Sequence, residues 1–207
     1  MKVVIKGIRW FCCLFLLLAA AAACGGGSSG QESVEETPGI SSSPAGEETP
    51  TVSAELPQGS ISQWAVEAEA SSVFSDPEWS AEQATGPPDA PVCGDAQFAW
   101  ASAASDSIDT LTVRYAVPVV PLKINIIQSY HPDQVVKVEV FQEERQTYYT
   151  VLQKNPEPVD RPCPFELEVN VTKIDFPIDQ VRITLDQSQL GLGWNEIDAV
   201  ELIGLEN

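Results

Sequence analysis

Between residues 61 and 207, apolar and polar residues alternate in several short stretches that are separated by Gly, Pro and Asp. In 121–130, for example, Leu122, Ile124 and Ile126 stand at every second position. Side chains of a β-strand point alternately to its two faces, so this pattern predicts strands with one buried face. The predicted strands are 63–70, 107–116, 121–130, 134–142, 147–153, 165–171, 180–186 and 193–204. Helical periodicity is scarce, and one short helix is expected at 79–84. The pattern therefore predicts an all-β fold, an antiparallel jelly-roll or β-sandwich.

The last predicted strand, 193–204, is bracketed by glycines. We expect Ile197 and Ala199 to face the core, with Glu196 and Asp198 on the opposite face. The alternation breaks after residue 199, which predicts a β-bulge near residues 200 and 201.

The start of the chain has the pattern of an export signal. Three basic residues precede an uncharged apolar run, 10–23, that is shorter than the roughly 18 residues of a membrane-spanning helix. The run ends in alanines before Cys24, a junction that resembles the lipobox of bacterial lipoproteins. We expect a signal peptide at 1–23 and a lipid on the Cys24 thiol, which makes the chain an exported protein anchored to the cell membrane and facing outward. An ordinary cleaved signal peptide is the alternative.

Residues 24–60 are rich in Gly, Ser, Pro, Thr and Glu and contain no aromatic residue. Such a segment buries too little apolar surface to offset its loss of conformational entropy. We interpret it as a disordered tether ahead of one folded domain, 61–207.

The chain is strongly acidic, with 11 basic and 30 acidic residues and a net charge of −19. Removal of the predicted signal peptide takes away three basic residues and leaves a net charge of −22. This charge argues against a nucleic-acid partner, whose phosphates require basic residues. It also favours a covalent link to the membrane over an electrostatic one.

Two cysteines, Cys93 and Cys163, remain after the signal peptide and Cys24 are set aside. An even pair in an exported chain indicates a disulfide. The alternative is a pair of metal ligands, but no second CxxC motif or histidine partner accompanies them.

Several blocks together resemble the galactose-binding-like (discoidin-like, or F5/8 type C-like) β-sandwich. The resemblance is to the variety found in pappalysin-type proteins and in the N-terminal half of an F-box/leucine-rich-repeat protein, and it runs from about 64 to 204. The blocks are Trp79-Ser80-Ala81, Ala84-Thr85-Gly86-Pro87-Pro88-Asp89, Gly94-Asp95, Ala99-Trp100-Ala101, Ser129-Tyr130-His131-Pro132, Arg182-Ile183-Thr184-Leu185-Asp186 and Trp194-Asn195-Glu196-Ile197-Asp198-Ala199-Val200. The resemblance implies an eight-stranded jelly roll that binds or scaffolds and does no chemistry.

The candidate ligand-binding residues are aromatic or acidic. Trp79, Trp100 and Trp194 lie in or beside predicted loops, and Tyr130 ends a predicted strand, so together they suit a stacking platform for a sugar ring. The alternative is that these tryptophans close the ends of the sandwich.

Glu196 and Asp198 face the same side of a strand and suit either a pair of hydrolytic carboxylates or acceptors for backbone N–H groups. His131, the only histidine, is a further candidate ligand residue. No G-x-S-x-G motif supplies a nucleophile for it, so no enzyme activity is expected.

Asp76, Asp89 and Asp95 lie in one acidic loop region. Their hard oxygen ligands suit calcium, and the resemblance implies a structural calcium in this loop. Turn formation is the ordinary alternative.

Two functions from different classes remain at this point. One is a surface-tethered module that binds carbohydrate or another wall component. The other is a structural or assembly lipoprotein whose sandwich docks on a partner protein.

Overall fold

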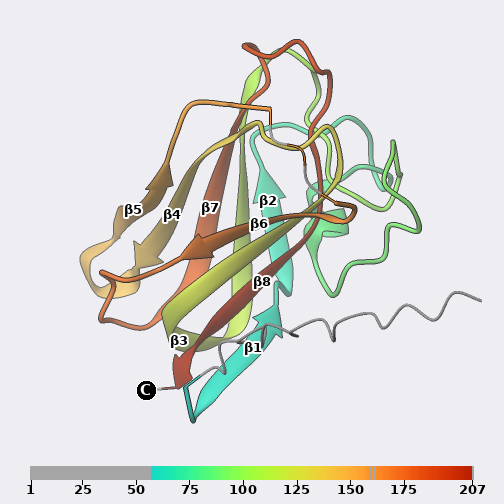
Figure 1. The fold of residues 1–207 in the computed structure, drawn as a ribbon. Coiled ribbons are helices and arrows are strands. Elements are labelled where there is room, and N and C mark those ends of the chain that lie inside the picture. Colours follow the sequence, from blue (N-terminus) through green and yellow to red (C-terminus); the bar gives the residue numbers. More distant parts are fainter. Residues whose placement is uncertain (1–56, 159, 161, 207) are drawn as a thin grey trace, which may run out of the picture. The chain divides into compact units, whose positions relative to one another are not determined.

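Strand β3 runs through both layers of the fold in the computed structural model, which describes residues 57–158, 160 and 162–206 (Figure 1). The strands are β1 (Ser60–Trp64), β2 (Glu67–Ala70), β3 (Ile108–Tyr130), β4 (Val135–Gln142), β5 (Thr147–Gln153), β6 (Phe165–Asn170), β7 (Ile178–Asp186) and β8 (Glu196–Glu206). The only helical segments among the described residues are two short 3-10 turns, η1 (Ala81–Ala84) and η2 (Glu143–Arg145). The expected all-β architecture is confirmed.

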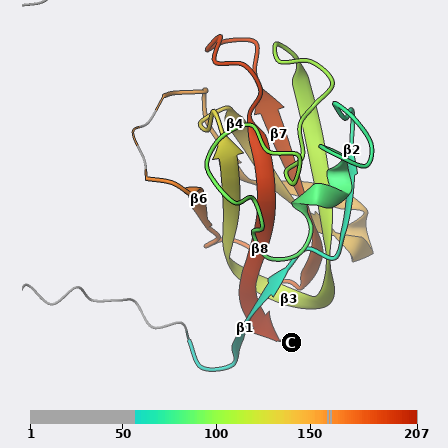
Figure 2. The same ribbon diagram turned by 90° about the vertical axis from the view of Figure 1, so that its right-hand side faces the viewer.

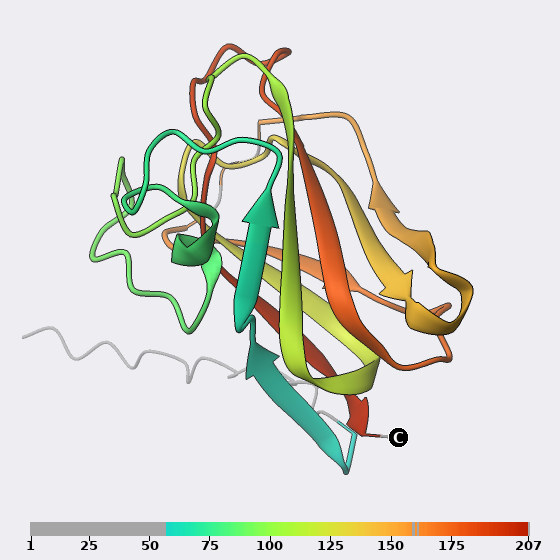
Figure 3. The ribbon, with the colours of Figure 1, turned by 180° about the vertical axis from the view of Figure 1, so that it is seen from behind.

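The first half of β3 pairs antiparallel with β2 and β7, and β7 continues to β4 and β5. We call these strands the β7 layer; Figure 3 shows them side by side. The second half of β3 pairs antiparallel with β6 and β8, and β8 pairs with β1, which gives the β8 layer. The register of β3 shifts between Arg114 and Val119, where the strand passes from one layer to the other.

Two predicted strands, 107–116 and 121–130, are therefore one continuous strand. The predicted strand 63–70 is instead divided, because the chain changes layers at Ala65 and Val66. The N–H of Ala65 donates to the carbonyl of Val200 in β8, and the N–H of Val66 donates to the carbonyl of Arg114 in β3. The predicted helix at 79–84 is the shorter turn η1.

The core lies between the two layers and consists of the inward-facing side chains of each strand. In β3 these are Leu111, Val113, Ile124 and Ile126, all with no exposed surface. They meet side chains of β4, β7 and β8 such as Val138, Val181, Ile183, Ile197 and Leu202. The period-two pattern thus places one face of each layer in a shared apolar core.

Strand β8 differs from its prediction in one respect. Ile127 pairs with Ala199 and Gln128 with Ile197, so Asp198 is an extra residue, and the bulge lies there instead of near 200 and 201. Because a bulge reverses the alternation, Ile197 and Val200 both join the core cluster. Ala199, predicted to face the core, is buried outside that cluster.

The disulfide between Cys93 and Cys163 is present, with 6.0 Å between the Cα atoms. It joins the long segment between β2 and β3 to the connection that precedes β6. The predicted signal peptide, the lipid attachment at Cys24 and nearly all of the predicted tether lie outside the described residues. Within the described part, no helix is long and apolar enough to cross a membrane.

We predict that Ile197→Asp strongly destabilises the fold, because it places a carboxylate in the core without a cationic partner. An unpaired buried charge costs several kcal/mol or forces its own neutralisation, a large share of the roughly 5–15 kcal/mol that stabilises a domain. Thermal unfolding should show a large decrease in Tm.

Ile108→Asp is the matched control, because Ile108 also lies in a strand but is 64% exposed. Its Tm should change little. Equal melting of the Ile197→Asp variant and the wild type would contradict the burial of β8.

Candidate functional site

Three aromatic side chains from distant segments meet where the loops gather beside the start of β8. The rings of Phe74 and Trp79 and those of Phe74 and Trp194 are each 5.4 Å apart, in edge-to-face contact. Phe74 is 50% exposed, and both tryptophans are half-buried. We call these residues the aromatic rim.

Backbone contacts fix the aromatic rim. The N–H of Phe74 donates to the carbonyl of Ala101, and the N–H of Ala101 donates to the carbonyl of Trp79. Trp79 has a positive φ of 55°, which turns the chain sharply at this point. The indole Nε1–H of Trp194 donates to the carbonyl of Ser102 over 2.9 Å. The rings therefore stand on a hydrogen-bonded frame.

A hollow of about 40 Å³ lies among the aromatic rim, Ala101, Asp95 and Glu196. On this measure one water molecule needs about 10–15 Å³, so the hollow holds a few water-sized groups and cannot enclose a sugar ring. A ligand larger than water would lie across the exposed ring faces and reach the hollow with single polar groups.

Glu196 forms the polar floor of this hollow and is almost completely buried. Its Oε2 accepts a hydrogen bond from the backbone N–H of Ala96 at 2.9 Å and one from the Ser129 hydroxyl at 3.3 Å. Burial is the largest influence on its pKa, and the neighbouring Asp95 carboxyl adds to it. Together they raise the pKa of Glu196 to about 7.

Asp198 has a similar but separate environment. Its Oδ1 accepts the backbone N–H groups of Asp89 and Ala90, both at 3.2 Å. Burial and the nearby Asp89 carboxyl raise its pKa. Glu196 and Asp198 thus each bind backbone donors of the segment between β2 and β3, as one of the two sequence interpretations expected. Nothing in this arrangement makes them a hydrolytic pair flanking one ligand.

The three aspartates proposed for calcium are not brought together. Asp95 lies by Glu196, Asp89 lies by Asp198, and Asp76 takes part in neither pair. Among residues 57–158, 160 and 162–206, no group of three or more His, Cys, Asp or Glu side chains is arranged to hold a metal ion.

Trp100 does not belong to the aromatic rim, although it was predicted to bind ligand together with Trp79 and Trp194. It has no exposed surface and sits in the core cluster. Its N–H and carbonyl form two backbone hydrogen bonds with Ile197 of β8, and its indole Nε1–H donates to the carbonyl of Ser72. Trp100 therefore closes the end of the sandwich, which was the alternative interpretation.

Tyr130 and His131 form a stacked pair with ring centroids 3.8 Å apart, and neither lines the hollow beneath the aromatic rim. His131 has a positive φ of 34°, and its carbonyl accepts a hydrogen bond from the Asn195 amide. Burial lowers the pKa of its imidazole. The pair connects the β3–β4 turn to the segment before β8.

The structure thus brings together Trp79, Trp194, Asp95 and Glu196 of the predicted site residues. Phe74, at the centre of the rim, was not predicted. The sequence did offer a signal for Phe74. It is a large aromatic residue in a predicted loop rich in turn residues, outside any strand or helix that would bury it in the core.

We predict that Glu196 makes stability depend on pH. Its folded pKa of about 7 exceeds its ordinary value of 4.5, so the folded chain holds a proton that the unfolded chain loses between these values. The contribution of Glu196 to stability is therefore full below pH 4.5 and falls as the pH rises to about 7. Replacement by the neutral Gln removes this loss.

The measurement is the Tm of Glu196→Gln minus that of the wild type across this range, which should increase with pH. The lowered pKa of His131 also makes stability depend on pH, in the opposite direction. This contribution is the same in both proteins and cancels when the two Tm values are subtracted. Parallel pH profiles for the two proteins would contradict the assignment.

Solved structures resemble this fold at low sequence identity. A variant of chitosan-binding module 1 from the chitosanase/glucanase of Paenibacillus sp. IK-5 is 14% identical, with a TM-score of 0.52 over 67% of this chain and 93% of that chain. A CBM32 module produced by Clostridium perfringens, in complex with GlcNAc-α-1,4-galactose, is 15% identical, with a TM-score of 0.51 over 67% and 89%. An F5/8 type C domain from Bacteroides fragilis is 12% identical, with a TM-score of 0.48 over 73% and 100%.

These likenesses concern the fold, the galactose-binding-like β-sandwich. No curated protein matches the sequence. One family of domains does match, over residues 54–207, and its description is "Pappalysin-1, SD scarf domain, C-terminal". Because that match covers the whole folded part, the chain belongs to the family of the C-terminal SD scarf domain of pappalysin-1.

Proposed function

We propose that this chain is a non-catalytic carbohydrate-binding protein and that sugar binds across the aromatic rim. The observation that carries the proposal is the partly exposed group of Phe74, Trp79 and Trp194 beside two carboxyl groups. The apolar face of a sugar ring packs on aromatic rings, and its hydroxyls require hydrogen-bond acceptors nearby. The rim supplies the first, and Asp95 and Glu196 supply the second.

Two of the structures that share this fold support the proposal, because they are a chitosan-binding module and a module in complex with GlcNAc-α-1,4-galactose. The fold alone does not determine the ligand. The exposed aromatic residues of this chain are therefore the primary support, and the relatives are secondary.

The site favours binding over catalysis. The carboxyl group of Glu196 is held by the N–H of Ala96 and the hydroxyl of Ser129, and Asp198 is held by two other N–H groups. In the contacts of the described residues, neither carboxyl group bonds a cysteine or histidine, and Ser129 donates its hydroxyl hydrogen to Glu196 itself. Stacking and hydrogen bonding account for all that this arrangement offers to a sugar.

We further propose that the chain is an exported lipoprotein anchored through Cys24, with 24–60 as the tether. The support is the short apolar run, its alanine-rich end and the glycine-rich segment that follows. Such an anchor would place the aromatic rim outside the cell, where polysaccharides are encountered.

Binding is tested with a glycan array and calorimetry on the mature chain made soluble by Cys24→Ala. Trp194→Ala should abolish the binding of uncharged glycans and should lower Tm less than removal of a fully buried indole, because Trp194 is partly exposed. Trp100→Ala is the contrasting variant: it removes a fully buried indole and should cost about 3–5 kcal/mol of stability. Undiminished binding of uncharged glycans by Trp194→Ala, or no binding of such glycans by the wild type, would refute the proposal.

The anchor is tested by expressing the full chain and its Cys24→Ala variant in bacteria. The wild type should carry an acyl mass and sediment with membranes, and the variant should do neither. Equal membrane retention of both proteins, with no acyl mass on the wild type, would reject lipidation.

A further inference from the structure

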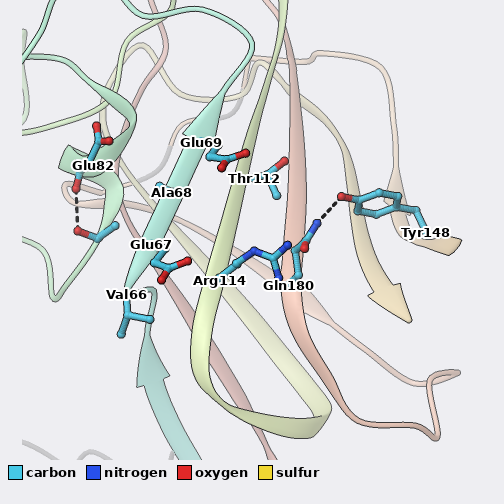
Figure 4. Close-up of a pocket in the computed structure, with 10 residues that line it drawn as sticks. Val66, Glu67, Ala68, Glu69, Glu82, Thr112, Arg114, Tyr148 and Gln180 are labelled. Carbon is cyan, nitrogen blue, oxygen red and sulfur yellow. Dashed lines mark hydrogen bonds between the residues drawn. The ribbon is translucent and has the colours of Figure 1, made fainter. Parts of the chain in front are cut away.

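A second hollow, larger than the first, lies on the outer face of the β7 layer (Figure 4). Its volume of about 450 Å³ is within the range of roughly 300–1,000 Å³ that is typical of small-molecule sites. It shares no lining residue with the hollow beneath the aromatic rim. It is lined by Val66, Glu67, Ala68, Glu69, Glu82, Thr85, Thr112, Arg114, Tyr148 and Gln180. We call it the sheet hollow.

The register of the strands places the polar groups of the sheet hollow side by side. Glu67 of β2 pairs with Arg114 of β3, and Arg114 pairs with Gln180 of β7. Glu69 and Thr112 form the next pair on the same face, two residues along. Paired residues on one face lie within reach of a single ligand.

The charges in the sheet hollow are not neutralised by the protein. Within the described part of the chain, the side chains of Glu67, Glu69 and Arg114 form no hydrogen bond or ion pair, although Glu67 and Arg114 are cross-strand partners. On the same layer, by contrast, Glu139 bonds both Lys137, at 2.6 Å, and Arg182, at 2.8 Å. Ion pairs between neighbouring side chains therefore do form on this layer, but the charged side chains of the sheet hollow form none.

Gln180 is an independent indication of a ligand. Its side chain lines the hollow yet is only 4% exposed. The amide Nε2–H donates to the hydroxyl of Tyr148, as Figure 4 shows, while Oε1 is buried without a partner. Rotation of the amide would only leave Nε2 unpaired instead. A buried polar atom without a partner is unfavourable, so a donor that reached Gln180 Oε1 from the hollow would be favoured.

The chemistry of the lining defines the ligand. Glu67, Glu69 and Glu82 outnumber the single cation, Arg114, so the hollow favours a positive charge. The glutamates and Gln180 Oε1 are acceptors, which suits an ammonium group with its three donors. Arg114 and the hydroxyls of Thr112 and Tyr148 suit the hydroxyl oxygens of the same molecule.

We propose that the sheet hollow binds an amino sugar, with its ammonium group at Glu67 and Glu69 and its hydroxyls at Arg114 and Gln180. This site is separate from the aromatic rim. It stands or falls independently of glycan binding there, because the two sites have no residue in common.

The test is an NMR titration of the mature chain, soluble through Cys24→Ala, with a trimer of glucosamine and with the N-acetylated trimer, which has the same ring but no charge. Changes in backbone amide chemical shifts report binding at each site separately, because the two sites have different lining residues. The glucosamine trimer should shift residues 67–69, 112–114 and 180, and the acetylated trimer should leave them unchanged. Equal shifts from both trimers, or none there from either, would overturn the proposal.

Glu67→Gln combined with Glu69→Gln should weaken the glucosamine trimer at this site about tenfold or more, since hydrogen bonds to charged groups are strong. Glu143→Gln combined with Glu144→Gln is the matched control, because it removes the same charge from exposed residues elsewhere. This control should change affinity less than about twofold, as expected for remote screened charges. Equal loss in both double variants would overturn the proposal.

Two more variants distinguish an amino sugar from a simple amine, and the sheet hollow from the aromatic rim. Arg114→Gln should weaken the glucosamine trimer but not spermidine, an amine without hydroxyls. Spermidine that binds as tightly as the trimer would overturn the assignment to a sugar.

Trp194→Ala should leave the shifts at 67–69 unchanged. If only this variant abolished binding of the trimer, the aromatic rim would be the sole site.

Discussion

Two backbone hydrogen bonds between Trp100 and Ile197 hold the long segment between β2 and β3 against the last strand, and the arrangement of the site depends on them (Figure 2). The indole of Trp100 is fully buried beside this contact and adds apolar surface to it. With the segment fixed here, Phe74 and Trp79 come from one side and Trp194 from the other. The aromatic rim is thus a consequence of how the segment covers β8.

The same covering segment explains the electrostatics of β8. Glu196 and Asp198 lie on the face away from the core, as their alternation with Ile197 requires, yet both are buried because the segment lies over them. Glu196 accepts one backbone N–H and a serine hydroxyl, and Asp198 accepts two backbone N–H groups. Among the described residues neither bonds a cation, and each has another carboxyl group beside it. Burial and like charge act in the same direction, so both pKa values rise.

The two proposed sites differ in physical character, although both are on one small domain. The aromatic rim offers ring faces and a hollow that admits only small polar groups. The sheet hollow offers charges and hydroxyls on the regular surface of a sheet, where cross-strand register sets their spacing. The aromatic rim therefore suits the apolar face of a sugar ring. The sheet hollow suits the charged or polar substituents of a sugar.

The sequence by itself predicted the all-β class, the approximate position of most strands, the family resemblance and a disulfide between Cys93 and Cys163. Period-two alternation is a local property, and the parity of cysteines requires no coordinates. It also predicted that Trp79 and Trp194 belong to one site, but it placed Trp100 and Tyr130 there as well, because all four lie in or beside predicted loops or at a strand end.

Only the tertiary structure decided which aromatic residues are exposed. Trp100 and Trp194 both stand in loops of the sequence, but backbone pairing with Ile197 buries the first, whereas the second lies at the surface. The sheet hollow was also beyond the sequence, because Glu67, Arg114 and Gln180 become neighbours only through strand pairing across many intervening residues. Burial and register are relations between distant segments, and local patterns of polarity do not contain them.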